Sequence, residues 1–228
     1  MSEPEIRNAA TVILVRDPDT APRVLMGQRG EKAVFMPSRF VFPGGALDPG
    51  DRDVPLAQPL AAPCRARLAE DAPDWIAHAL AAAAVRELWE ETGLILGAPG
   101  AWPGAPPEDW RDFAATGHVP SAEGLSFVFR AITPPGRPRR FDARFFLADA
   151  ARICCDPDDF SRAEEELSHL QWIPLEEIRQ FHMPFITEVV LAEVAAALPR
   201  LEAPETVPFF RNDDEESLFL RLGGSPLR

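Results

Sequence analysis

Three glutamates near the end of one predicted helix are the residues of this chain whose types and spacing indicate chemistry. Glu90 and Glu91 follow Glu87 by three and four positions, so the three carboxylates project from one helical face. Like charges at this spacing repel, and in the local sequence only Arg86 offsets them. A hard divalent cation would supply the missing positive charge, because such ions take oxygen ligands and leave room for phosphate oxygens. The pattern therefore indicates a metal site, and the alternative is a solvated acidic face.

The position of these glutamates within the helix favours a functional role over a stabilising one. Asp74 is predicted to cap a helix that runs through an alanine-rich tract to Thr92, with Gly93 as the left-handed residue that ends it. The helix dipole favours carboxylates at the N-terminus and disfavours them in the last turns, where these three lie. We therefore interpret the cluster as functional.

The segment 86–94 resembles the second half of the motif of Nudix hydrolases. It reads Arg-Glu-Leu-Trp-Glu-Glu-Thr-Gly-Leu, and the family pattern is Arg-Glu-U-x-Glu-Glu-x-Gly-U, in which U is aliphatic. Every fixed position of this half matches. Upstream, the pair Gly44 and Gly45 resembles the glycine loop at which the motif begins. The chain is therefore similar to a family of metal-dependent enzymes that hydrolyse diphosphate linkages.

The first half of the motif departs from the family pattern. Gly45 precedes Arg86 by 41 positions where the pattern has 14, which implies 27 extra residues. His78 stands eight positions before Arg86, where the family has a glutamate that supports the metal site. The number of metal ions therefore stays open. Asp48 or Asp51, just after the glycine pair, would replace the missing carboxylate, or both are ordinary turn residues.

The resemblance implies roles for the residues of the motif. The three glutamates would hold one or more Mg²⁺ or Mn²⁺ ions, which bridge the diphosphate and lower the pKa of the attacking water. Arg86 would pair with Glu90 one turn further on and orient its carboxylate, and both residues are expected to serve catalysis. The backbone of Gly44 and Gly45 would bind substrate, because it leaves space for the diphosphate and donates amide hydrogen bonds.

A further carboxylate, acting as base or metal ligand, is common in Nudix enzymes and comes from a loop outside the helix. Glu164, Glu165 and Glu166 are the candidates in this chain. Glu166 is preferred as the catalytic residue by its position before the segment 171–175, which is also similar to the family. For each of the three, the alternative is a solvated acidic turn.

Other segments are similar to the branch of the family that includes the peroxisomal coenzyme A diphosphatases. This similarity spans roughly residues 9–198 and rests on the long insertion and on 35–37, 40–45 and 140–146. It implies hydrolysis of coenzyme A or an acyl-coenzyme A to 3′,5′-adenosine bisphosphate and phosphopantetheine or its acyl ester. The alternatives are ADP-ribose, NADH or another nucleotide as substrate. A second alternative is a Nudix-fold binding module whose catalysis decayed with the loss of the first glutamate.

Two arginines are predicted to bind substrate. In the coenzyme A signature upstream of the glycine pair, Arg29 occupies the first Arg position, whereas Val34 and Ser38 stand where a second Arg and a Gly are expected. Arg29 is therefore the candidate on that side of the site. Arg140 belongs to a basic cluster at 137–140 that would receive a substrate phosphate. Alternatively, Arg140 belongs to a structural ion-pair ladder along its strand.

The elements that must position these residues alternate between strands and helices. Aliphatic and aromatic runs predict strands at 11–16, 23–28, 40–42, 126–133, 140–148 and 170–173. The first two are predicted to form a hairpin, because the segment between them has a strong turn composition. Helices are predicted at 74–92, 108–115, 175–181 and 184–198. The glycine pair predicts a special loop after the third strand. This order predicts a mixed sheet covered on both faces, and the resemblance implies an α/β (α+β) class, a Nudix-type α/β/α sandwich with a catalytic loop-helix-loop.

A chain of 228 residues is expected to form a single Nudix domain over 1–228. Segments at about 47–73 and 101–120 read as insertions because they are rich in proline and lack a sustained period. A C-terminal helix and a tail follow. In the tail, 208–210 is expected to pack on the core and 212–216 to form an exposed acidic turn.

The charge and cysteine content limit the partners. The net charge of −13 (23 basic against 36 acidic residues) opposes a nucleic-acid scaffold but allows a small nucleotide diphosphate substrate beside a divalent cation. The three cysteines have no zinc or redox spacing, and no apolar stretch has the length of a bilayer. We therefore expect a cytoplasmic protein without membrane contact. Small Nudix proteins commonly dimerise, so a homodimer is a further expectation that the resemblance adds.

Overall fold

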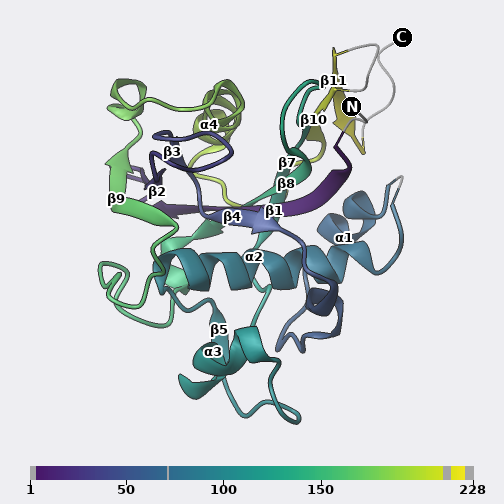
Figure 1. Cartoon of the computed structure of the whole chain (residues 1–228), viewed down its shortest axis with the longest axis vertical. Coiled ribbons are helices and arrows are strands. Elements are labelled where there is room, and N and C mark those ends of the chain that lie inside the picture. The colour runs from purple at the N-terminus through teal and green to yellow at the C-terminus, as the bar shows by residue number, and fades with distance from the viewer. Residues whose placement is uncertain (1–3, 71, 213–216, 224–228) are drawn as a thin grey trace.

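Nine strands form one mixed β-sheet in the computed structural model, which describes residues 4–70, 72–212 and 217–223 (Figure 1). The strands of this sheet are β1 (Ile6–Arg16), β2 (Arg23–Arg29), β3 (Phe40–Val41), β4 (Gly44–Ala46), β7 (Ser126–Ile132), β8 (Arg140–Asp149), β9 (Leu167–Pro174), β10 (Val207–Asn212) and β11 (Ser217–Leu222). Their order is β11-β10-β7-β8-β1-β2-β3, with β4 also paired to β1 and β9 to β2. The pairs β1–β8 and β7–β10 are parallel and the others antiparallel, so the predicted mixed sheet is confirmed.

Helices cover both faces of this sheet. The α-helices are α1 (Ala62–Leu68), α2 (Ile76–Thr92), α3 (Arg111–Ala115) and α4 (Phe185–Ala197). The 3₁₀-helices are η1 (Pro49–Asp53), η2 (Glu108–Trp110), η3 (Ala150–Arg152) and η4 (Ile178–Gln180), and a small separate sheet pairs β5 (Gly97–Pro99) with β6 (His118–Pro120). In Figure 1, α1 and α2 lie on one side of β1 and α4 lies on the other. This is the α/β/α arrangement that the sequence predicts.

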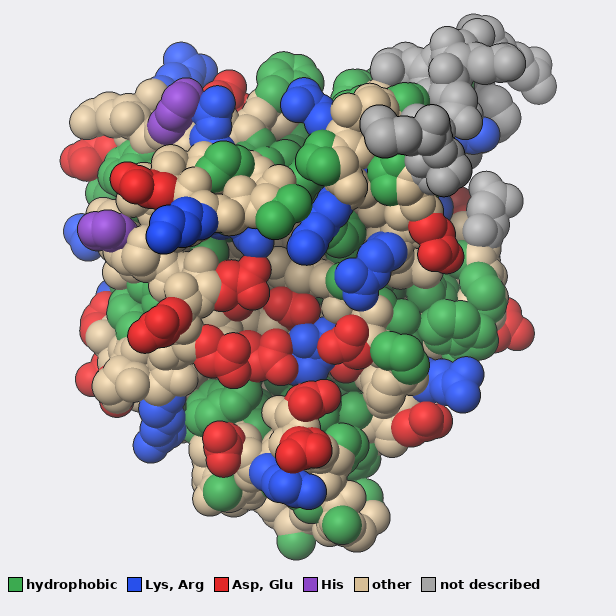
Figure 2. Space-filling view, viewed as in Figure 1, with side chains coloured by type: hydrophobic (Ala, Val, Ile, Leu, Met, Phe, Trp, Pro, Cys, Tyr) green, Lys and Arg blue, Asp and Glu red, His purple; other side chains and the backbone are tan. Residues whose placement is uncertain are grey.

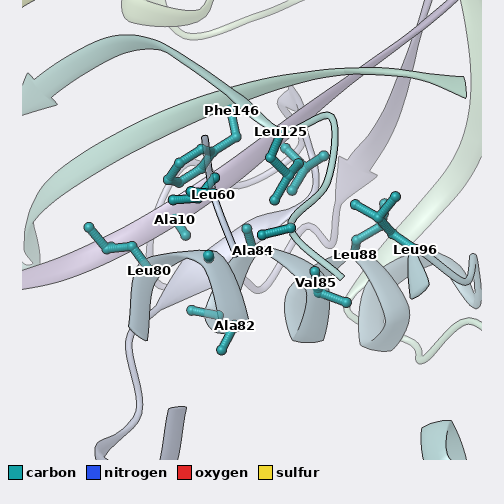
Figure 3. Close-up of a cluster of buried hydrophobic side chains, with 14 of the residues drawn as sticks. Ala10, Leu60, Leu80, Ala82, Ala84, Val85, Leu88, Leu96, Leu125 and Phe146 are labelled. Carbon is teal, nitrogen blue, oxygen red and sulfur yellow. The ribbon is translucent and has the colours of Figure 1, made fainter. Parts of the chain in front are cut away.

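The helix α2 packs closely on the sheet because its buried face is made largely of alanine. Leu80, Ala84 and Leu88 of this helix belong to one buried cluster with Ala10 of β1 and Phe146 of β8 (Figure 3). Alanine side chains end at Cβ, so the helix backbone lies near the strands at close-packed density. A second buried cluster lies between the opposite face of the sheet and α4. The close approach on the first face brings the last turns of α2 beside β4.

The helix α2 ends where the sequence predicts but begins differently. Gly93 follows Thr92 in the left-handed conformation, with φ of 73°, and its amide closes the last turn through a 2.7 Å hydrogen bond. The predicted cap by Asp74 is wrong, because the residue before Ile76 has the N-cap position and makes no side-chain cap. A backbone turn serves instead, since the amide of Ile76 donates to the carbonyl of Pro73 at 3.0 Å.

Both predicted insertions supply side chains to the core. In the first insertion, α1 buries Cys64 and Leu68 against the rest of the α2-side cluster. In the second, the predicted helix at 108–115 is confirmed as η2 followed by α3. Phe113 of α3 packs edge-on against Trp89 of α2 with ring centroids 5.6 Å apart. The insertions therefore support the helix that carries the glutamates.

The C-terminal tail adds β10 and β11 to the sheet, and the sequence did not predict these strands. The expected packing of 208–210 on the core is confirmed, because β10 pairs with β7. The predicted exposed turn at 212–216 is wrong at Asn212, which is buried and whose side-chain Nδ2 donates to the carbonyl of Ile132 at 2.7 Å. Residues 213–216 lie outside the described part of the chain.

The helix predicted at 175–181 is wrong, since this segment forms only the 3₁₀ turn η4. Its start is held by the β1–β2 turn, because the amide of Leu175 donates to the carbonyl of Pro22 at 2.9 Å. The helix predicted at 184–198 is confirmed as α4. Among the helices that the structure describes, none has both the length and the apolar character needed to cross a membrane.

Candidate active site

The glycine pair lies directly against the glutamates of α2. Gly44 and Gly45 form β4 and pair with β1, so they make a strand where the sequence predicts a loop. The amide of Gly44 donates a 2.7 Å hydrogen bond to Glu91 Oε2. A Cβ at Gly45 would lie 2.6 Å from Glu87 Cδ and would overlap its carboxylate. Only glycine at position 45 therefore leaves the Glu87 carboxylate in this place beside β4.

Acidic side chains gather around this contact. Figure 2 shows them across the middle of one face of the molecule, over the position of α2 in Figure 1, with a basic side chain among them. Arg86 is 5% exposed, and its Nη1 donates to both Glu87 Oε1 and Glu90 Oε2 at 2.9 Å. The predicted pairing of Arg86 with Glu90 is therefore confirmed. This buried guanidinium fixes the orientation of two of the three glutamates.

Asp51 of η1 pairs with the other side of Arg86. Its carboxylate is 2% exposed and accepts from Arg86 Nε at 3.0 Å and from Nη2 at 3.1 Å. Asp48 lies further from this guanidinium, at 3.7 Å, and about half of its side chain is exposed. His78 faces elsewhere, with its Nε2 2.8 Å from the carbonyl oxygen of Val54 in the insertion. Of Asp48, Asp51 and His78, Asp51 therefore makes the closest contact with the site.

The glutamates carry more negative charge than their surroundings balance. Burial raises the pKa of Glu87 to about 7, and the charges of Glu90 and Glu166 add to this rise. Burial also raises the pKa of Glu90 to about 6. For Glu91, burial followed by the charge of Glu87 raises the pKa well above 4.5. A cation beside these carboxylates would therefore stabilise their ionised forms.

Two of the three loop glutamates lie near this cluster, because the charge of Glu166 acts on Glu87 and Glu91 and that of Glu164 acts on Glu90. Arg29 at the end of β2 and Leu167 at the start of β9 are opposite each other in the sheet. Arg29 Nη2 donates to Glu166 Oε1 at 2.6 Å. The loop is also held at the helix end, because the amide of Glu164 donates to the carbonyl of Glu90 at 2.8 Å. Arg29 and Glu166 thus meet at the site although 137 positions separate them.

The donor set fits a hard divalent cation in kind, since it consists of carboxylate oxygens with a surplus of negative charge. As the side chains stand, no three acidic, histidine or cysteine residues in the described part of the chain converge on a metal position. Each carboxylate is instead turned toward a donor of the protein: Glu87 and Glu90 toward Arg86, Glu91 toward an amide, and Glu166 toward Arg29. A cation would compete with these donors for the same oxygens.

Arg140 lies apart from this cluster, which corrects the expectation that it binds substrate. It is 3% exposed, and its guanidinium donates to the carbonyls of Thr133 at 3.1 Å and Asn212 at 3.2 Å. These bonds tie β8 to the residue after β7 and to the end of β10, and the buried guanidinium leaves a substrate no access. The alternative, a structural ion-pair ladder, is found beside it, where Asp142 pairs with Arg130 at 2.7 Å and Arg144 at 3.1 Å.

The fold and the site together define a protein of the Nudix type, with a glycine pair and an Arg-Glu-rich helix on a mixed sheet. A crystal structure of a NUDIX hydrolase from Alicyclobacillus acidocaldarius superposes with a TM-score of 0.63 and 28% identity, covering 85% of this chain and 92% of that one. Among curated proteins, "Putative nudix hydrolase 7" of Caenorhabditis elegans is 32% identical over an alignment of 178 residues that covers 73% of this chain. The chain belongs to the Nudix hydrolase family.

The name of a second curated relative includes a substrate. "Acyl-coenzyme A diphosphatase NUDT19" of Gallus gallus is 29% identical over an alignment of 218 residues that covers 69% of this chain. The chain spans about half the length of these curated relatives, 51% of the nematode protein and 56% of the chicken protein. No family model matches the chain.

Proposed function

We propose that this protein hydrolyses a diphosphate linkage in a nucleoside diphosphate derivative, with Mg²⁺ or Mn²⁺ held by Glu87, Glu90 and Glu91. The observation that carries the proposal is the clustering of these carboxylates around Arg86 and the glycine pair, with pKa values raised by desolvation. When bound, the cation would neutralise charge on the diphosphate and lower the pKa of the attacking water.

Other residues of the chain orient the carboxylates, leave space beside them and supply a further carboxylate. Arg86 holds Glu87 and Glu90 in fixed orientations, and Asp51 anchors Arg86 from the other side. The glycine pair leaves space beside the carboxylates because it has no side chains to fill it. Glu166, with 54% of its side chain exposed, is open to solvent and supplies the further carboxylate of the reaction, either as the base that takes a proton from water or as a ligand of the cation.

Coenzyme A or an acyl-coenzyme A is the substrate that the similarity to other Nudix proteins supports best. The support consists of the named chicken relative, the similar segments at 35–37, 40–45 and 140–146, and Arg29 at the first position of the upstream signature. Val34 favours the alternative of ADP-ribose or NADH, because it replaces the second arginine with an exposed apolar side chain. Ser38 replaces the signature glycine and has a left-handed φ of 57°.

The test is a product assay across coenzyme A, acetyl-coenzyme A, ADP-ribose, NADH and nucleoside triphosphates with Mg²⁺ or Mn²⁺, with products identified by mass. We expect release of 3′,5′-adenosine bisphosphate from the coenzyme A compounds. Glu90→Gln should lower this rate by about a hundredfold or more, since it removes a charge at the metal. Glu108→Gln is the matched control, because Glu108 is exposed on the second insertion. Wild-type rates in Glu90→Gln would refute the mechanism, and no turnover of any compound would favour a binding module.

A further inference from the structure

The ion pair of Arg29 with Glu166 differs from the other contacts of the site carboxylates, by which we mean Glu87, Glu90, Glu91 and Glu166. Glu87 and Glu90 share Arg86 and are 11% and 22% exposed in their side chains, and Glu91 is buried. Glu166 is 54% exposed, and among the described residues its carboxylate is held by the 2.6 Å bond from Arg29 Nη2. It is therefore the site carboxylate that can change partner without rearrangement of the core.

Arg29 itself is incompletely satisfied. Its Nε is buried and has no hydrogen-bond partner within the described residues, although its Nη2 is bonded to Glu166. A buried N–H without an acceptor is costly, so a native arrangement normally supplies a partner. The guanidinium also lies close enough to Glu91 to favour its ionised form. Arg29 is thus a cation at the edge of the site with a donor that still lacks an acceptor.

We propose that Arg29 is a positioning residue that binds Glu166 in the metal-free protein. When a divalent cation binds Glu166, Arg29 releases this carboxylate and binds a phosphate oxygen of the substrate instead. The inference rests on the proposed function. The cation and Arg29 compete for one carboxylate, because both are positive and Glu166 is exposed enough to receive either. Once released, the planar guanidinium can donate two parallel bonds to a phosphate, including the bond from Nε.

The exchange predicts opposite effects of one substitution on the two ligands. Arg29→Gln should bind Mn²⁺ more tightly, by about two- to fivefold, because a partly exposed ion pair no longer competes. The same variant should bind a non-hydrolysable diphosphate, methylenediphosphonate, about tenfold more weakly in the presence of saturating Mg²⁺, since a charge-assisted hydrogen bond is lost. If Arg29 served only the fold, its substitution would not strengthen the binding of one ligand and weaken the binding of the other.

The experiment measures Mn²⁺ affinity by electron paramagnetic resonance and methylenediphosphonate affinity by calorimetry. The variants are Arg29→Gln, Glu166→Gln and the double variant. Glu166→Gln should weaken Mn²⁺ binding, and adding Arg29→Gln to it should change Mn²⁺ affinity no further. Arg16→Gln is the matched control and should leave both affinities unchanged, because Arg16 forms a comparable 3.0 Å pair with Asp158 at the end of β1, opposite the start of β2.

The outcomes separate this inference from the proposed function. Unchanged or weaker Mn²⁺ binding in Arg29→Gln would overturn the exchange, as would unchanged methylenediphosphonate binding, even if the wild-type protein is an active hydrolase. Both expected shifts in a protein that hydrolyses none of the tested diphosphates would support the exchange and reject the proposed reaction. A wild-type chain that binds no Mn²⁺ would overturn both.

Discussion

Arg86 uses all five of its N–H donors within the site. Nε and Nη2 donate to the two oxygens of Asp51, Nη2 donates also to the carbonyl of Ala46 at 3.0 Å, and Nη1 donates to Glu87 and Glu90. A lysine has three donors on a single nitrogen and cannot span these positions. At the scale of single residues, this guanidinium is therefore what ties the first insertion, β4 and α2 together.

Asp51→Asn should therefore unfold more easily and lose activity. The substitution removes the charge that faces a buried guanidinium, and breaking a buried pair costs about 3 kcal/mol. Urea denaturation at pH 7 in EDTA measures the loss of stability. Asp48→Asn is the control and should change stability by less than about 0.5 kcal/mol, because Asp48 is half-exposed and 3.7 Å from Arg86. Equal losses in the two variants would contradict the role that we assign to Asp51.

At the scale of elements, the site depends on the distance between β4 and α2. The alanine-rich face of the helix lets it lie close to the sheet, and Gly45 leaves space for the carboxylate of Glu87. Trp89 on another side of α2 packs against Phe113 of the second insertion. The helix is therefore held between the sheet and an insertion, which limits how far it can move to accommodate a larger residue.

Gly45→Ala should disturb the site more than the fold. The new Cβ would overlap the Glu87 carboxylate, so this side chain must leave the position in which it accepts from Arg86, at a cost of about 1–3 kcal/mol. We expect the best hydrolytic activity to fall by about tenfold or more. Gly50→Ala in η1 is the control, because no atom lies within 4 Å of a Cβ there. Activity retained in Gly45→Ala would show that the close contact is not needed.

At the scale of the whole molecule, the buried glutamates make stability depend on pH. The chain carries 36 acidic against 23 basic residues, so the protein as a whole does not relieve the repulsion within the site. Burial and the charge of Glu87 raise the pKa of Glu91 above its ordinary 4.5. The folded state then binds more protons than the unfolded state above about pH 4.5, so this group lowers stability as pH rises.

Glu91→Gln should therefore stabilise the metal-free protein at pH 7.5. The amide oxygen can still accept from Gly44, while the buried charge is removed. Thermal unfolding in EDTA should show a melting temperature about 3 °C above that of the wild type, and the difference should shrink toward pH 4.5. Added Mg²⁺ should raise the melting temperature of the wild type more than that of the variant. A variant that melts below the wild type at pH 7.5 would contradict this account.

Local sequence patterns predicted the helix end at Gly93, the β1–β2 hairpin and the spacing that places Glu87, Glu90 and Glu91 together. These features depend on contacts within a few residues: left-handed glycine, a turn-rich connection and the period of 3.6 residues. The nature of the site, a cluster of carboxylates with one arginine, therefore follows from the amino-acid sequence by itself.

Long-range packing determined which residues from distant segments contact the site. Asp51 rather than Asp48 pairs with Arg86 because the insertion folds back over α2, and Arg29 meets Glu166 because β2 pairs with β9. Arg140 is buried by strands whose pairing has no local signal. A residue's burial and its partner depend on which distant segments lie beside it, and no spacing along the chain reports that.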